Sequence, residues 1–153
     1  MKNIRVADIL LSEAEVASLV VKGWVRTKRE SKEFVFLEIN DGSCLKNLQA
    51  IIDAGSDGFD LLERVNTGAA VSLEGALVES PGQGQKWELK VRRLEVLGEA
   101  DPSYPLQKKR HTDEYLRTIA HLRPRTNKFG ALNRIRAELA VGVHRFFHER
   151  GFF

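Results

Sequence analysis

Five segments in the first two thirds of the chain are rich in branched and aromatic residues, and most of them alternate apolar and polar positions with a period of two. Such alternation is typical of half-buried β-strands. Between the third and the fourth segment, residues 59–65 have helical apolar spacing that stops near Gly68. The five predicted strands are Val20–Arg29, Phe34–Asn40, Leu48–Asp53, Ala70–Glu79 and Trp87–Leu97.

Five short strands with a helix between the third and the fourth is the order of elements in an OB-fold barrel. We therefore expect a mainly β domain over residues 1–103, in which residues 1–19 form an irregular segment packed against the barrel. Turn residues between the segments, such as those at 40–43 and 80–84, support this division.

The pattern changes after residue 103. Prolines at 102 and 105 break regular structure, and residues 104–126 are interpreted as a linker with a short helix at Thr112–Ala120. Asn127 is the expected N-cap of a helix that runs to about Glu149 and stops at Gly151. Nothing in the chain remains to cover the apolar stripe of this helix. We interpret residues 127–153 as the truncated start of a second, α+β domain. The stripe consists of Leu132, Ile135, Leu139, Val143 and Phe146.

Charge divides the chain at nearly the same place. Residues 1–104 carry 13 Lys/Arg against 17 Asp/Glu, and residues 105–153 carry 11 against 4, so the balances are −4 and +7. A basic second part suits a polyanionic partner, or else acidic counterparts that lie elsewhere in a longer protein. No apolar run approaches the roughly 18 residues of a membrane helix. The start has no signal-peptide pattern, and Cys44 is the single cysteine, so a cytoplasmic location is expected.

Strand parity singles out two residues of the predicted barrel. Val35, Leu37 and Ile39 share the inward face of the second strand, so Phe36 points outward where OB-folds stack bases on aromatic rings. It could instead pack against the opening segment or a neighbouring domain. Gln49 points outward beside it and offers a donor and an acceptor to an unpaired base, although an ordinary solvated glutamine would look the same.

Four charged residues near these two are further candidates. Glu88 should lie on the exterior of the fifth strand, where it could accept hydrogen bonds from a guanine edge or pair with a neighbouring lysine. Arg26, Lys28 and Arg29, near the end of the first strand, could contact phosphates or stack on bases, or simply be solvated. Parity with Val25 would turn Arg29 inward unless the strand bends before it.

The sequence predicts neither a catalytic nor a metal-binding site. His144 and His148 stand four residues apart on the last helix, but no third ligand accompanies them. No P-loop, nucleophilic triad or paired-carboxylate signature stands out, so no catalytic residue is expected in this chain.

Several motifs resemble one family of enzymes. The first group, similar to the anticodon-binding domain of class IIb aminoacyl-tRNA synthetases, is Val21–Arg29, Phe36-Leu37, Asn40–Ser43 and Leu48–Ile52. The second group resembles the bacterial asparaginyl-tRNA synthetase family and consists of Ser80–Gln85, Tyr104-Pro105, Lys108–Thr112, Glu114–Arg117 and His121–Asn127. Together the resemblance covers essentially the whole chain.

The resemblance implies roles for four of the candidate residues. In that family an OB domain binds an anticodon loop whose central base is uracil. The uracil-stacking phenylalanine falls on Phe36 and the base-reading glutamine on Gln49. An anticodon-contacting arginine falls on Arg29, and an acidic residue of the last strand falls on Glu88.

The resemblance also implies a parent enzyme that joins asparagine to tRNA(Asn) with ATP and Mg²⁺. The helix from Asn127 resembles motif 1, the homodimer interface of class II synthetases, while the ATP-binding motifs 2 and 3 are missing, so this stretch alone should be inactive. The alternatives are the same module of an aspartyl- or lysyl-tRNA synthetase, or a stand-alone OB protein that binds single strands.

Overall fold

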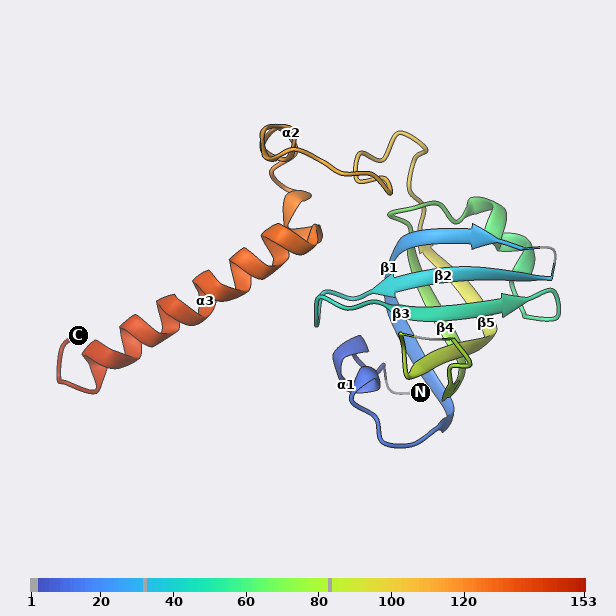
Figure 1. The fold of residues 1–153 in the computed structure, drawn as a ribbon, viewed down its shortest axis with the longest axis horizontal. Coiled ribbons are helices and arrows are strands. Elements are labelled where there is room, and N and C mark those ends of the chain that lie inside the picture. Colours follow the sequence, from blue (N-terminus) through green and yellow to red (C-terminus); the bar gives the residue numbers. More distant parts are fainter. Residues whose placement is uncertain (1–2, 32, 83) are drawn as a thin grey trace. The chain divides into compact units, whose positions relative to one another are not determined.

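The computed structural model describes residues 3–31, 33–82 and 84–153. It divides into two compact units, one up to Lys109 and one from Arg110 onward. The first unit contains the β-strands and the second is helical (Figure 1).

The first unit is a closed, five-stranded barrel with the strand order β1-β2-β3-β5-β4. All neighbouring strands are antiparallel except β3 and β5, which run parallel. Figure 1 shows β1, β2 and β3 side by side on the wall of the barrel. This architecture confirms the predicted barrel, and three of the strands have the predicted bounds. The elements are β1 Val16–Glu30, β2 Phe34–Asn40, β3 Leu48–Asp53, the 3₁₀ helix η1 Phe59–Arg64, β4 Ala70–Glu79 and β5 Trp87–Gly98.

Alternate residues of the strands fill the barrel. On β2 the side chains of Val35, Leu37 and Ile39 are at most 6% exposed, whereas the residues between them are partly exposed. Trp87 opens β5 as the largest fully buried side chain, and its indole Nε1–H donates to the carbonyl of Ser12 at 3.0 Å. Closure of the barrel pairs every strand on both sides, so the described strands leave no open sheet edge.

The opening segment is more regular than the sequence predicted. A short helix, α1 (Val6–Leu10), precedes β1, which itself begins four residues earlier than expected. The free N–H groups at the start of α1 are satisfied by the turn after β2. Val6 N–H donates to Asp41 Oδ2, and Ala7 N–H donates to Ser43 Oγ, both at 2.9 Å. These partners lie 35 and 36 residues away in sequence, so local patterns could not reveal them.

Replacing Asp41 by alanine should release α1 from the barrel. Burial opposes ionisation of Asp41, but hydrogen bonds from Ser43 and Val6 outweigh it and lower the pKa of the carboxyl below its usual 3.8. A lowered pKa means that the contact stabilises the fold above about pH 4 and is lost as the pH falls through the folded-state value. We expect a loss of about 1–2 kcal/mol of stability at neutral pH and faster hydrogen exchange at residues 4–10.

Asp101 provides the control for this prediction, because its carboxylate accepts from Ser103 N–H in a local turn. Asp101→Ala should leave exchange at residues 4–10 unchanged. Equal protection of α1 in the wild type and in Asp41→Ala would contradict the assigned contact.

The second unit consists of short helical turns and one long helix. These are α2 (Asp113–Thr118), η2 (Arg123–Arg125) and α3 (Asn127–His148). The cap of α3 is Thr126 rather than the predicted Asn127, because Thr126 has extended backbone angles and its Oγ1 accepts from Phe129 N–H. The helix ends as predicted, with Gly151 at φ +80° and its N–H bonded to the carbonyl of His148.

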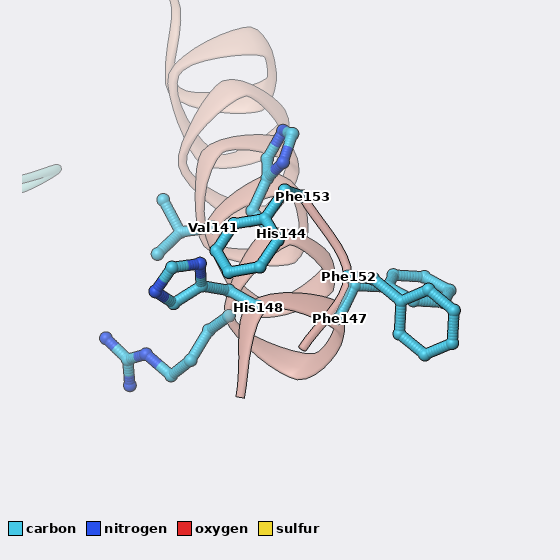
Figure 2. Close-up of a pocket in the computed structure, with 7 residues that line it drawn as sticks. Val141, His144, Phe147, His148, Phe152 and Phe153 are labelled. Atoms are coloured by element: carbon cyan, nitrogen blue, oxygen red, sulfur yellow. The ribbon is translucent and has the colours of Figure 1, made fainter. Parts of the chain in front are cut away.

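Apolar side chains stay exposed along α3. Ile135 and Leu139 are 58% and 63% exposed, and both terminal phenylalanines are also open to solvent. At the end of the helix Phe147 and Phe152 lie side by side with ring centroids 5.8 Å apart, next to a hollow that His144 and His148 also line (Figure 2). Among the described residues no three potential metal ligands come together, and no helix there has the length and apolarity to cross a membrane.

Candidate nucleic-acid interface

Strand register places two rows of outward residues across four strands of the barrel. Residues that face each other on neighbouring strands share a side of the sheet. The polar row is Thr27, Glu38, Gln49 and Glu88, and the aromatic row is Arg29, Phe36, Ile51 and Lys90, each in the order β1, β2, β3, β5. The two rows lie two residues apart on β2, β3, β5 and β1, so they form one continuous surface.

Phe36 lies in the aromatic row as strand parity predicted. It is half-buried and pairs in register with Arg29 on one side and Ile51 on the other. The Arg29 guanidinium carbon lies 5.6 Å from the centroid of the Phe36 ring, within the range of a cation–π contact. The ring is thus held between a cation and an aliphatic side chain while part of it remains accessible.

Arg29 reaches this surface because β1 contains an irregularity. Val25 pairs with the inward Ile39, but the register with β2 shifts between Val25 and Thr27, so that Arg29 pairs with the outward Phe36. A bulge adds one residue to a strand and reverses the side that later residues face. Simple alternation from Val25, which predicted an inward Arg29, is therefore wrong beyond the bulge.

Gln49 is half-buried in the polar row, with Glu38 opposite it on β2 and Glu88 opposite it on β5. The Glu38 carboxylate accepts from Asn47 Nδ2 at 3.1 Å, and Asn40 Nδ2 in turn donates to Asn47 Oδ1 at 3.1 Å. Sequence reasoning did not select Glu38 as a site residue. The sequence does indicate Glu38, because it lies two residues after Phe36 and so faces the same side of the strand.

Glu88 lies on the predicted side of β5, but it is not a freely exposed carboxylate. The residue is only 3% exposed, and Ser80, at the start of the loop before β5, donates its hydroxyl to Glu88 Oε2 at 3.0 Å. Lys86, one of the neighbouring lysines that could have paired with it, instead places its ammonium 4.7 Å from the centroid of the Trp87 ring. The prediction of an exterior side chain is corrected to a buried one that is hydrogen-bonded to the loop before β5.

The two remaining basic candidates lie outside the rows. Lys28 pairs in register with the inward Leu37, and its ammonium donates to the carbonyl of Leu62 at 2.7 Å and pairs with Glu30 at 2.8 Å. Arg26 is half-buried at the register shift of β1. The structure therefore brings together Phe36, Gln49, Arg29 and Glu88, and leaves Lys28 and Arg26 aside.

The chemistry of the surface suits an unpaired nucleic-acid strand. The aromatic row offers an apolar stacking face with a cation at each end, Arg29 and Lys90, for the negatively charged backbone. The polar row offers an amide between two carboxylates, which can hydrogen-bond to base edges.

Residues 19–97 match the family described as the OB-fold nucleic acid binding domain, of the tRNA anticodon type. The matched range contains all eight residues of the two rows. The chain belongs to this family. The polar row and the aromatic row therefore lie within the matched OB-fold domain.

Relatives of the whole chain point to one kind of enzyme. The chain is 56% identical to the asparagine–tRNA ligase of Oleidesulfovibrio alaskensis over 154 residues, which cover 100% of this chain and 33% of the relative. It is 58% identical to that of Lawsonia intracellularis over 149 residues, 97% of this chain and 33% of the relative. The chain thus spans about a third of the length of these curated relatives.

A solved structure of the asparaginyl-tRNA synthetase from Pyrococcus horikoshii shares the fold. Its TM-score is 0.80 at 20% identity, over 99% of this chain and 35% of that one.

Proposed function

We propose that the OB-fold domain recognises the anticodon loop of tRNA(Asn), with the central uracil stacked on Phe36 and its edge read by Gln49. The observation that carries the proposal is the placement of a half-buried aromatic ring on β2 and an outward amide on β3, in the two neighbouring rows of one surface. Identities of 56% and 58% to asparagine–tRNA ligases favour asparagine over the sister specificities for aspartate or lysine, and over a stand-alone OB protein.

The two side chains suit uracil for different reasons. A base stacks on an aromatic ring irrespective of its identity, so Phe36 supplies affinity rather than selection. The uracil edge presents one N–H between two carbonyl oxygens, and a glutamine amide can accept from that N–H while donating to one oxygen. Cytosine and the purines arrange their donors and acceptors differently, so Gln49 supplies the selection.

The longer protein is proposed to be a cytoplasmic enzyme that joins asparagine to tRNA(Asn), with ATP and Mg²⁺ as its cofactors. Residues 127–153 would then begin its class II catalytic domain, and the exposed apolar residues of α3 would enter a homodimer interface at motif 1. We assign neither ATP nor Mg²⁺ to a residue of this chain. This chain alone should not form an aminoacyl-adenylate.

Changing the central anticodon base tests the proposal. The 153-residue chain is titrated with a hairpin that carries the asparagine anticodon GUU and with the same hairpin carrying GAU. We expect binding of the GAU hairpin to be at least about tenfold weaker, because the base-reading hydrogen bonds of Gln49 are lost. Equal affinity for the two hairpins would overturn anticodon recognition by this domain.

A further inference from the structure

Ser80 forms the centre of a hydrogen-bonded cluster in the loop between β4 and β5. Its backbone N–H donates to the carbonyl of Lys86 at 2.9 Å and closes the loop. Its hydroxyl oxygen accepts from Gly82 N–H at 3.2 Å and from Gln85 Nε2 at 3.1 Å. A serine hydroxyl has two lone pairs and one proton, and these two donors occupy both lone pairs. The proton is therefore left for Glu88 Oε2, which lies 3.0 Å away.

This arrangement fixes one oxygen of the Glu88 carboxylate and leaves the other for a ligand. Within the described part of the chain, no buried side-chain nitrogen or oxygen lacks a hydrogen-bond partner. Ser80 is the partner found there for the carboxylate, and it engages Oε2. Among the described residues no partner is found for Oε1, which leaves this oxygen for a ligand although the residue as a whole is only 3% exposed. Glu88 is the β5 member of the polar row and pairs in register with Gln49.

We propose that Ser80 is a positioning residue for base recognition. By holding Oε2, it aims Oε1 of Glu88 at the guanine that precedes the central uracil in the anticodon GUU. The inference rests on the proposed function and adds Ser80 as the residue that orients Glu88. Ser80 itself does not touch the RNA in this account.

The chemistry of a carboxylate favours guanine at this position. An ionised carboxylate only accepts hydrogen bonds, and the Watson–Crick edge of guanine presents N–H donors at N1 and at its 2-amino group. Adenine presents an acceptor at N1, which repels a carboxylate, and uracil presents one N–H between two acceptors. A carboxylate held in one orientation discriminates better than a mobile one, because a misplaced acceptor cannot rotate away from the wrong base.

Removing the Ser80 hydroxyl tests the orientation of the Glu88 carboxylate without changing its charge. In Ser80→Ala the carboxylate remains but loses its donor, whereas Ser80→Thr keeps a hydroxyl. Ser72→Ala is the matched control, since Ser72 lies on β4 in register with Lys22 and Glu95, outside both rows. The 153-residue forms of all four proteins are titrated with hairpins that carry GUU, AUU and GAU.

The ratio of GUU to AUU affinity is the decisive quantity. In Ser80→Ala we expect it to fall by about tenfold, as for loss of a hydrogen bond to a charged group, while the ratio of GUU to GAU affinity is retained. Ser80→Thr and Ser72→Ala should keep both ratios. A Ser80→Ala protein with an unchanged GUU/AUU ratio overturns the inference, even if it melts earlier. So does a Ser80→Thr protein whose ratio falls as far. A wild type that binds GUU and GAU equally overturns the proposed function instead.

Discussion

Replacing Phe36 by alanine should weaken binding of the asparagine anticodon hairpin by about 1–3 kcal/mol, the usual loss for one base–aromatic stack. The substitution removes no cation, so the slope of log affinity against log salt concentration should stay the same. The ring points out of the barrel and is half-buried, so the melting temperature should change little. Titrations of both proteins at several salt concentrations, together with thermal melts, measure all three quantities.

Two neighbouring substitutions serve as controls for Phe36→Ala. Arg29→Ala removes the cation that lies 5.6 Å from the ring, so it should weaken binding and flatten the salt slope by about one unit if Arg29 contacts a phosphate. Leu37→Ala removes a side chain that is 0% exposed, and it should lower stability by about 2–5 kcal/mol. A Phe36→Ala protein that binds normally but melts as early as Leu37→Ala would show that the ring belongs to the core.

Replacing Gly75 by alanine should be among the most damaging single changes to the barrel. A Cβ atom built at this position would lie 2.0 Å from the carbonyl oxygen of Lys90, a backbone atom of the adjacent strand. Gly75 also sits where the register of β4 and β5 shifts, next to Glu74. One of the two strands must move to admit the methyl group, and we expect a loss of about 3 kcal/mol or more of unfolding free energy.

Gly98 offers a matched glycine for this measurement. It ends β5 in the same sheet, and a Cβ there would lie 3.9 Å from the Cβ of Ala70, an ordinary contact distance. Gly98→Ala should therefore change stability by less than about 1 kcal/mol. Urea unfolding of the two variants gives the comparison, and similar midpoints would refute the close approach of β4 and β5 at Gly75.

The strands were predictable from sequence because their signal is local. On β2 the residues from Phe34 to Asn40 alternate without interruption between exposed and buried positions. This alternation alone predicts the length of the strand and which of its side chains face the core. Parity turned Phe36 and Gln49 outward, and the resemblance to the synthetase family assigned their roles at the anticodon. The long helix α3 was likewise predicted from its spacing, and only its cap was misassigned by one residue.

The features that sequence could not give depend on partners far along the chain. The bulge in β1 that turns Arg29 outward is visible only in its register with β2. The burial of Glu88 depends on how the loop from Ser80 folds back, and the start of α1 depends on Asp41. Each of these features decides where a charged side chain points or what it contacts. The alternation of apolar and polar residues therefore predicted the surface but not the contacts of its charged groups.

The central claim is that the uracil in the middle of the anticodon lies against Phe36, and photocross-linking tests it most directly. A GUU hairpin with 5-iodouracil at the central position is bound to the 153-residue chain, irradiated, and the adduct is mapped by peptide mass spectrometry. We expect the main adduct at Phe36, and its loss in Phe36→Ala. Adducts confined to residues 110–153 would place the uracil on the second unit and contradict the account.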